Sequence, residues 1–511
     1  MAEENFLLTK IVATLGPATS EPEIIEKLIL EGVRVFRINF SHGTFDEHEA
    51  HLNRVRQASK KLNIPIGVLG DLAGPKIRVG NVQEDGVRLA AEDIVEFQKE
   101  DIFTESPHEN EPVVFSTTYP HFIEEVQPGE RVLLDDGYVR LICIDKANDR
   151  VRCKVVDGGL ITSNKGVNLP DTDMSVPALT EKDVECAEFA VDKGFDFLAL
   201  SFVRRGEDIK RLKEKLRKLG ARPSSEFPFR DNDLEFSAIE VESESIIPVI
   251  CKIEKPQAID NLTEILRESD AVMVARGDLG VEMDLAEVAV FQKRIINLCQ
   301  EYGIPVIVAT QMLQSMIDSP TPTRAEVSDV ANAIFDGADA VMLSGETAIG
   351  KYPVRTVRMM NRIAQKTNAF LKSEPVLRAM PPKITAVHRR VAAIAHSIRS
   401  IVQDMDVKYL VIWSQLGGGA VYLSQQRILR PILFFSPSET MLRRTSLLYG
   451  IKPMTMSQPE SVTDFLKSVD ALLLENKWAE RSDTIVGLLA EPIHKMGIAN
   501  EIVIHYVGDV S

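Results

Sequence analysis

IPVICKIEKPQAIDNLTEILRESDAVMVARGD, residues 247–278, is the stretch that decides the fold of this chain. It predicts a buried strand, an amphipathic helix and a second buried strand, the repeating unit of parallel sheets. Lys252 and Glu254 interrupt the first strand and point to the same side of it, because side chains alternate along a strand. A buried charge is costly unless something pairs with it. A partner is therefore expected opposite these two side chains.

Strand and helix patterns of this kind alternate eight times along the chain. Eight units are the number that closes a parallel β/α barrel, so we predict an α/β fold with a (β/α)8 TIM barrel formed by residues 1–72 and 173–370. The predicted strands are KIVATLG (10–16), VFRINFS (35–41), IPIGVLGDL (64–72), FDFLALSF (195–202), IPVICKIE (247–254), DAVMVARGD (270–278), IPVIVATQ (304–311) and DAVMLSGE (339–346).

Two regions fall outside the barrel pattern. Residues 73–172 carry short alternating segments with Gly and Asp turns, which predict an inserted small β-barrel domain. Residues 385–511 predict a C-terminal α/β domain, and the polar stretch 221–245 is expected to be a solvated surface insertion. The strands expected in the C-terminal domain are KYLVIWS (408–414), RPILFFS (430–436), TIVGLLAE (484–491) and EIVIHYVGD (501–509).

The amino-acid composition argues against several classes of binding partner. A net charge of −16 over 511 residues argues against a nucleic-acid surface or a polybasic membrane patch. The five cysteines are scattered and lack CxxC spacing, which indicates reduced thiols without a metal framework. The acidic N-terminus predicts no signal peptide, and no apolar run is long enough to span a membrane. We therefore expect a cytoplasmic protein.

Polar residues end the predicted strands at one end of the barrel, where reactive residues of such barrels gather. Glu254 and Asp278 come from adjacent strands and offer hard oxygen ligands with room for water, which suits Mg²⁺. The two glycines of ARGDLG could expose backbone N–H groups to a carboxylate or phosphate. The polar residues at these ends are Arg37, Asn39, Ser41, His42, Asp71, Ser201, Arg204, Arg205, Lys252, Glu254, Arg276, Asp278, Thr310, Gln311, Ser344 and Glu346.

Four cations, Arg37, Arg78, Arg205 and Lys252, can surround a phosphate at this end of the barrel. A divalent ion and several cations around one polyanion are the parts that phosphoryl transfer needs. No Walker-type GxxxxGK[ST] motif occurs, so a P-loop enzyme is excluded. Taken singly, each residue also fits a structural role, and Glu254 with Asp278 fits an ion-pair network as well as a metal site. Their joint placement favours catalysis.

Several motifs together resemble the pyruvate kinase family. The likeness runs through residues 10–365 and more weakly through 385–511. The motifs are RINFSHG (37–43), KGVNLP (165–170), PALTEKD (177–183), KIE (252–254), MVARGDLGVE (273–282), ATQMLQSM (309–316) and PTRAEVSDVANAIFDGADAVMLSGETAIGKYP (322–353).

The resemblance implies transfer of the phosphoryl group of phosphoenolpyruvate to ADP, giving pyruvate and ATP, the last step of glycolysis. By motif, Glu254 and Asp278 would hold Mg²⁺, with Mn²⁺ as an alternative ion. Lys252 would stabilise charge on the phosphoryl group in flight, and Arg37 would bind the substrate phosphate. The family also implies a homotetramer, and residues 73–172 would form a lid that excludes water.

The remaining site residues follow from the same resemblance. The amides of Gly277 and Asp278 would hold the substrate carboxylate, and Thr310 and Ser344 would protonate the enolate. Arg205 stands where many relatives have lysine. The residues implied to contact the nucleotide phosphates are Asn39, His42, Arg78 and Arg205.

Monovalent-cation use is predicted from DLAGPKIRVG (71–80). Many relatives bind K⁺ through residues that match Asn39, Ser41, Asp71 and the carbonyl of Leu72, and they carry glutamate where this chain has Lys76. A lysine ammonium is a tethered monovalent cation, so we expect that K⁺ is not required. The alternative is that Lys76 points to solvent and the ion still binds.

Two rival functions are open to a barrel of this kind. A metal-dependent lyase of the pyruvate-handling barrel type could use Glu254 and Asp278 but would not need Lys252 or the lid. A catalytically dead, metabolite-sensing paralogue is disfavoured because the catalytic set is complete.

In the C-terminal domain, WSQLGGGAVYLS (413–424) lacks the hydroxyl cluster of relatives that sugar bisphosphates activate. Fructose 1,6-bisphosphate is therefore expected to be a poor activator.

Overall fold

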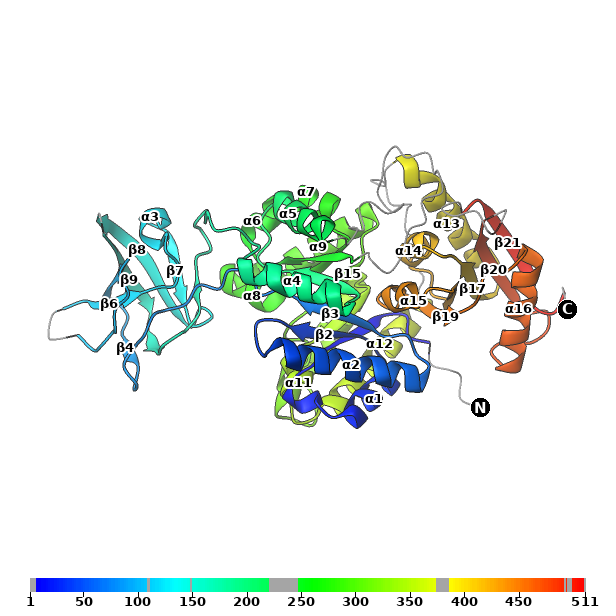
Figure 1. Cartoon of the computed structure of the whole chain (residues 1–511), viewed down its shortest axis with the longest axis horizontal. Coiled ribbons are helices and arrows are strands. Elements are labelled where there is room, and N and C mark those ends of the chain that lie inside the picture. The colour runs from blue at the N-terminus through cyan, green and yellow to red at the C-terminus, as the bar shows by residue number, and fades with distance from the viewer. Residues whose placement is uncertain are drawn as a thin grey trace.

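The molecule consists of three parts in a row, with the barrel in the middle (Figure 1). The structure is a computed structural model, and for residues 386–389 it describes the backbone alone. The insertion at 221–245 lies outside the described residues. Described are residues 6–107, 111–147, 149–219, 247–373, 386–490, 493 and 499–509.

The middle part is a closed barrel of eight parallel strands, as predicted. The strands follow one another around the ring in chain order, and the last pairs with the first through Lys10 and Ala340. All residues of the strands other than β2 are buried, as in parallel sheets that are covered on both faces. The strands are β1 (Lys10–Thr14), β2 (Val33–Asn39), β3 (Gly67–Asp71), β12 (Phe197–Leu200), β13 (Val249–Ile253), β14 (Ala271–Ala275), β15 (Val306–Ala309) and β16 (Ala340–Leu343).

Long helices surround the barrel, and threonines set where several of them begin. Thr44, Thr180 and Thr323 each accept a hydrogen bond from the backbone N–H three residues on, and the acidic side chain there accepts one in return. These capping boxes satisfy N–H groups that have no partner inside the helix. The helices around the barrel are α1 (Pro22–Leu30), α2 (Phe45–Leu62), α4 (Glu181–Lys193), α5 (Gly206–Lys218), α7 (Leu262–Glu268), α9 (Leu285–Tyr302), α10 (Arg324–Asp336) and α12 (Pro353–Ser373).

Short helices change two junctions from the predicted ones. Strand β14 ends at Ala275, so Arg276 and Asp278 lie on the short helix α8 (Arg276–Glu282) instead of on the strand. The helix expected between residues 259 and 269 is divided at Asn261, which ends α6 (Pro256–Asp260) and caps α7 with non-helical ψ. The Asn261 side chain donates to the Arg204 carbonyl at 2.9 Å, which ties this break to the segment before α5. A further short helix, α11 (Gly345–Ala348), follows β16.

The part inserted between β3 and α4 is a separate curled sheet with its own apolar core. Six strands pair in the order β11-β7-β8-β9-β5-β6, and β10 pairs with β4. The one helical turn in this part is α3 (Phe122–Glu125), among the residues described. The strands are β4 (Val87–Leu89), β5 (Ile94–Gln98), β6 (Val113–Ser116), β7 (Arg131–Leu134), β8 (Val139–Ala147), β9 (Arg150–Asp157), β10 (Gly159–Ile161) and β11 (Val167–Asn168).

The C-terminal part is the predicted α/β domain, with a sheet ordered β19-β18-β17-β20-β21. Strand β19 was not predicted, because Pro453 interrupts its pattern. The strand lies at the sheet edge, where a missing N–H is tolerated. The strands are β17 (Val407–Trp413), β18 (Ile432–Ser436), β19 (Ile451–Thr455), β20 (Thr484–Leu489) and β21 (Glu501–Tyr506), and the helices are α13 (Ala386–Asp404), α14 (Gly418–Gln425), α15 (Glu439–Thr445) and α16 (Val462–Glu475).

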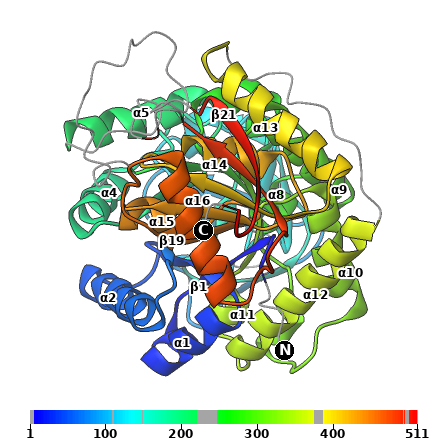
Figure 2. The ribbon, with the colours of Figure 1, turned by 90° about the vertical axis from the view of Figure 1, so that its right-hand side faces the viewer.

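The two flanking parts meet opposite ends of the barrel. Arg427 of the C-terminal domain lies 2.9 Å from Asp339, which directly precedes β16 at the N-terminal end of the strands. Figure 2 shows the C-terminal sheet lying over this end, with the barrel helices around it. The inserted sheet follows the C-terminal end of β3, so it lies at the end where reactive residues are expected. None of the described helices is long and apolar enough to cross a membrane.

Candidate active site

Lys252 lies at the centre of a buried charge cluster at the C-terminal end of β13. Its Nζ lies 2.7 Å from Glu254 Oε1 and 3.5 Å from Asp71 Oδ1, and it donates to Ser201 Oγ at 2.7 Å. Burial alone would lower the pKa of Lys252, but the charges of Asp71, Glu254 and Asp278 raise it above its ordinary value. The partners expected from the sequence are thus two carboxylates, and the ammonium stays charged at neutral pH.

Asp71, at the end of β3, joins Lys252 to Arg37 of β2. Arg37 Nε lies 2.6 Å from Asp71 Oδ2, and Arg37 Nη1 donates to Thr14 Oγ1 at 3.2 Å. Burial acts to raise the pKa of Asp71, but the nearby Lys252 and Arg37 outweigh it and lower that pKa. Two cations are therefore held side by side at the mouth of the barrel by one ionised carboxylate.

Glu254 and Asp278 form the acidic side of the mouth. Glu254 is buried, and its Oε2 accepts the backbone N–H of Phe202 at 2.7 Å, whereas the Asp278 side chain is exposed. Burial and the negative charge of Asp278 raise the pKa of Glu254, and Lys252 opposes this. A cation between the two carboxylates would relieve their repulsion, so this donor set fits a divalent ion with few protein ligands and several others from water or substrate.

Thr310 follows β15 in a strained conformation that aims its hydroxyl at α8. Its φ is +68°, which is unusual for a β-branched residue. Thr310 Oγ1 accepts the N–H of Gly277 at 2.6 Å and donates to the Ala309 carbonyl at 2.6 Å. Arg276 Nη2 donates to the Thr310 carbonyl at 2.8 Å and so holds the turn in place. The Gly277 amide, expected to face a substrate carboxylate, here contacts the Thr310 hydroxyl.

Ser344 lies at the end of β16, and its hydroxyl is buried without a hydrogen-bond partner among the described residues. Its backbone N–H donates to Glu346 Oε2 at 2.7 Å. Glu346 is fully buried and also accepts the N–H of Leu313 through Oε1 at 3.1 Å. The Ser344 hydroxyl is thus held in place by its backbone while remaining available to a ligand or water.

Comparison with known proteins identifies the family. Residues 7–222 and 226–357 match the family model described as pyruvate kinase, barrel domain, and residues 392–505 match pyruvate kinase, alpha/beta domain. The chain belongs to the pyruvate kinase family.

Individual relatives are similar over nearly the whole chain. The pyruvate kinase of Mycobacterium intracellulare is 40% identical to this chain, and that of Corynebacterium glutamicum is 39% identical; each match covers 98% of both proteins. A crystal structure of a pyruvate kinase from Cryptosporidium parvum is 30% identical with a TM-score of 0.83, and the match covers 98% of this chain and 96% of that one.

The residues that the family resemblance relates to the nucleotide are spread around the mouth. The His42 side chain is exposed, but its pKa is lowered, first by partial burial and then by nearby positive charges. These charges belong to Lys76, Arg78 and Arg37, which therefore lie close enough to act on the His42 ring. Arg78 Nη1 donates to the carbonyl of Asn164 in the inserted sheet at 2.7 Å. The mouth therefore carries a second group of cations beside the Lys252 cluster.

Two further nucleotide candidates are engaged elsewhere in this structure. Arg205 is exposed and lies 3.3 Å from Asp173 on the chain that returns from the inserted sheet. Asn39 Oδ1 accepts the backbone N–H of Ser41 at 3.1 Å. His42 is therefore within electrostatic reach of Arg37 in the Lys252 cluster, whereas the contacts of Arg78 and Arg205 are with Asn164 and Asp173.

Two of the oxygen atoms predicted to bind K⁺ already accept hydrogen bonds from the protein itself. The Leu72 carbonyl accepts a hydrogen bond from Ser201 Oγ at 2.6 Å, and Asn39 Oδ1 is occupied by an N–H group. The Lys76 side chain reaches the surface, but its pKa is lowered, chiefly because part of the side chain is buried. The positive charges of Lys252 and Arg78 lower the pKa further, and the negative charges of Asp278 and Asp71 act in the opposite direction. Lys76 thus lies within the electric field of the site.

Phe202 is the functional residue that sequence reasoning missed. It adopts a φ of +55° at the end of β12 and offers its backbone N–H to Glu254. A backbone amide can belong to any residue type, so no sequence signal marks it. Ser201 and Arg276 were noted as polar strand-end residues, but their contacts with Lys252 and Thr310 depend on the fold.

Proposed function

We propose that this chain transfers the phosphoryl group of phosphoenolpyruvate to ADP and produces pyruvate and ATP in the last step of glycolysis. The observation that supports this most is the buried cluster of Lys252, Arg37 and Asp71 beside Glu254 at the barrel mouth. Preorganised cations at a developing negative charge are the main means by which proteins catalyse phosphoryl transfer.

Lys252 and Arg37 would bind the substrate phosphate and stabilise the phosphoryl group as it moves. Asp71 keeps both cations in fixed positions, so little reorganisation is needed when charge develops. Because the surrounding carboxylates raise the pKa of Lys252, its ammonium remains charged throughout the working pH range. The lysine ammonium acts as a point charge and the arginine guanidinium forms paired hydrogen bonds, and together they suit a phosphoryl group that changes position during the reaction.

Glu254 and Asp278 would hold Mg²⁺, with Mn²⁺ as the alternative. Bound there, the ion would neutralise negative charge on the substrate's phosphate and carboxylate oxygens. Glu254 is held by the Phe202 amide, which orients its carboxylate towards the mouth. The described part of the chain has no group of three or more His, Cys, Asp or Glu side chains that could hold a metal ion. Glu254 and Asp278 would therefore supply two ligands, and most of the others would come from substrate and water.

Thr310 and Ser344 would complete the reaction by protonating the enolate that remains when the phosphoryl group leaves. A proton passes from Thr310 Oγ1 to the methylene carbon of the enolate, and a new C–H bond forms. The Thr310 hydroxyl accepts the Gly277 amide N–H, and the Ser344 hydroxyl, which has no hydrogen-bond partner among the described residues, would take part in returning a proton to Thr310. The Gly277 and Asp278 amides would hold the substrate carboxylate once the Gly277 amide exchanges partners.

The nucleotide would bind between the barrel mouth and the inserted sheet, through Asn39, His42, Arg78 and Arg205. Residues 73–172 would act as a lid that closes over the substrates and excludes water. We further propose that Lys76 replaces K⁺, and that the protein works as a homotetramer in the cytoplasm.

The test is to supply phosphoenolpyruvate, ADP and Mg²⁺ to the purified chain and to measure pyruvate and ATP. We expect equal amounts of both products. Pyruvate formed without ADP at the same rate would indicate a lyase or hydrolase, and absence of both products would indicate a protein that only binds metabolites.

A further inference from the structure

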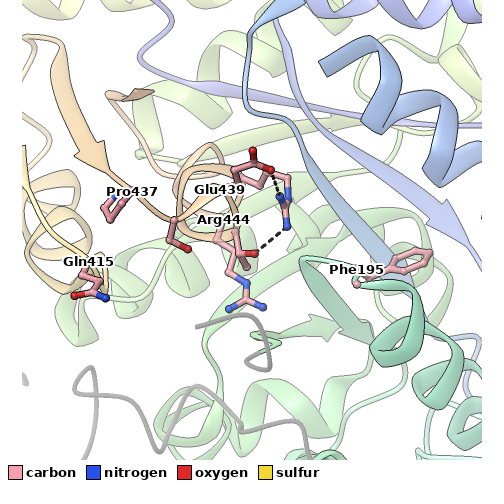
Figure 3. A pocket seen from close by; sticks show the side chains of 9 residues that line it. Phe195, Gln415, Pro437, Glu439 and Arg444 are labelled. Carbon is pink, nitrogen blue, oxygen red and sulfur yellow. Dashed lines mark hydrogen bonds and ion pairs between the residues drawn. The ribbon is translucent and has the colours of Figure 1, made fainter. Parts of the chain in front are cut away.

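The inserted sheet contacts the barrel mouth through a short segment near its end, on the opposite side of the barrel from the cavity of about 580 Å³ shown in Figure 3. Asn168 of β11 donates from Nδ2 to Glu282 Oε1 at 2.7 Å, and the Pro170 carbonyl accepts from Gln257 Nε2 at 3.0 Å. Glu282 ends α8, and Gln257 lies on α6. One short segment of the inserted part therefore touches two separate helices of the barrel mouth.

These two helices adjoin the candidate metal ligands. Helix α8 carries Asp278 one turn before Glu282, and α6 begins at Pro256, two residues after Glu254. A movement of the inserted sheet that shifted either helix would therefore change the distance between the Glu254 and Asp278 carboxylates.

A buried ion pair between Lys255 and Glu282 joins the two helices to each other. Lys255 Nζ lies 2.7 Å from Glu282 Oε1, and the two side chains are 3% and 1% exposed. Lys255 Nζ also lies 5.9 Å from the centre of the ring of Phe202, whose backbone N–H binds Glu254. The other Glu282 oxygen, Oε2, is buried without a hydrogen-bond partner among the described residues. The buried Glu282 carboxylate is therefore compensated by Lys255 and Asn168, and loss of either changes how firmly the other is held.

We propose that Glu282 is a positioning residue that couples the inserted sheet to the metal ligands, through Asn168 on one side and Lys255 on the other. The inference rests on the proposed function, because that function assigns Glu254 and Asp278 to the metal. With both contacts in place, α8 holds Asp278 in a fixed position relative to Glu254, so little rearrangement is needed to take up the ion. Coupling between two sites is reciprocal, so a bound ion restrains the inserted sheet in turn.

The test uses the full chain with Mn²⁺ and no substrate. It measures the dissociation constant of Mn²⁺ by electron paramagnetic resonance and the hydrogen exchange of residues 165–170 by mass spectrometry. In the wild type we expect Mn²⁺ to slow this exchange. Asn168→Ala removes the contact with Glu282 and keeps the ion pair with Lys255, so we expect Mn²⁺ to bind at least about fivefold more weakly and no longer to slow the exchange. Asn81→Ala, at an exposed asparagine of the inserted part, is the matched control and should behave as wild type.

A second variant removes the ion pair without leaving a buried charge. Glu282→Ala alone leaves Lys255 buried without its carboxylate and destabilises the fold. Lys255→Met combined with Glu282→Leu replaces the pair by apolar side chains, and we expect this double variant to fold and to lose the response of residues 165–170 to Mn²⁺. A purely structural role would change the melting temperature and leave that response intact.

Three results would overturn the proposal. They are wild-type Mn²⁺ binding and slowing in Asn168→Ala, an equal loss in Asn81→Ala, and no slowing by Mn²⁺ in the wild type. The assay of pyruvate formation separates this proposal from the proposed function. Normal pyruvate formation without slowing would count against the coupling alone, and slowing without pyruvate formation would count against the proposed function alone.

Discussion

At the scale of single residues, the site depends on a lysine that the fold buries between carboxylates. Lys252 contacts Glu254 and Asp71, and Asp71 in turn contacts Arg37. Removing one member of a buried ion pair leaves an uncompensated charge, so the members depend on one another. The arrangement keeps two cations at the mouth of the barrel, ready for a phosphate.

Acid should weaken the contribution of Asp71 to stability. Its pKa in the folded protein lies below the ordinary value, so its ion pairs stabilise the fold above pH about 4. This stabilisation is lost as the pH falls through the lowered pKa. We therefore expect Asp71→Asn to lower the melting temperature at neutral pH and to differ less from wild type at about pH 3. Asp173→Asn, at an exposed carboxylate, is the control for the amide substitution, and an equal gap at both pH values would contradict this prediction.

Lys76 should make K⁺ unnecessary. We expect full activity when a tetraalkylammonium salt replaces KCl in the presence of Mg²⁺, because the Lys76 ammonium lies within the field of the site. Lys76→Glu should introduce K⁺ dependence, whereas Lys165→Glu, a change of equal charge in the inserted sheet, should not. A fall of more than about tenfold in the wild-type rate without K⁺, near 1.4 kcal/mol, would refute the idea.

At the scale of elements, the turns after the barrel strands bring separate segments into contact. The positive φ values of Phe202 and Thr310 turn the chain sharply after β12 and β15. These turns place the Phe202 amide on Glu254 and the Thr310 hydroxyl on the Gly277 amide. Strain of this kind persists where the surrounding contacts hold it, and it is common at functional sites.

Thr310→Ala should separate the two halves of the reaction. Without the hydroxyl, the enolate loses its proton donor, and we expect the exchange of pyruvate methyl protons with solvent to fall by about 10²-fold. Thr310→Ser keeps the hydroxyl and should retain most of the exchange. The measurement is deuterium incorporation into pyruvate followed by NMR, and an unchanged exchange rate in Thr310→Ala would remove this residue from the proposed relay.

Periodicity was sufficient to predict the barrel, because eight buried strands alternate with helices over its whole length. Periodicity did not predict β19, an edge strand whose pattern Pro453 interrupts. It also assigned Arg276 and Asp278 to a strand, although both lie on helix α8. Strand-end polar residues were also predictable in kind. Their pairing, such as Asp71 between Arg37 and Lys252, depends on neighbours that are distant in sequence, and one chain alone does not reveal it.

At the scale of the whole molecule, the C-terminal domain is attached to the N-terminal end of the barrel strands, opposite the candidate site. Arg427 joins the two parts, because it contacts Asp339 at 2.9 Å and donates to the Ala338 carbonyl at 3.0 Å, while its guanidinium lies over the ring of Tyr449 in its own domain. These contacts tie the C-terminal domain to the residues that directly precede β16.

Arg427→Met should uncouple the C-terminal domain from the barrel. The change leaves Asp339 buried without its cation, and breaking such a buried pair costs about 3–5 kcal/mol. We expect calorimetry to show a lower melting temperature, with the C-terminal domain unfolding as a separate transition. Arg430→Met removes an arginine that contacts only its own domain among the described residues and serves as control. A single transition at the wild-type temperature in Arg427→Met would contradict the prediction.

The most direct test of the proposed function is the rate of pyruvate formation from phosphoenolpyruvate and ADP in wild type, Lys252→Met and Lys213→Met. Lys213 is a buried lysine in an ion pair away from the mouth, so its variant controls for loss of a buried charge. We predict that Lys252→Met loses at least about 10²-fold in rate while still exchanging the methyl protons of pyruvate, and that Lys213→Met stays near wild type. A near-normal rate in Lys252→Met would contradict the assignment of Lys252 as the cation that stabilises the transferred phosphoryl group.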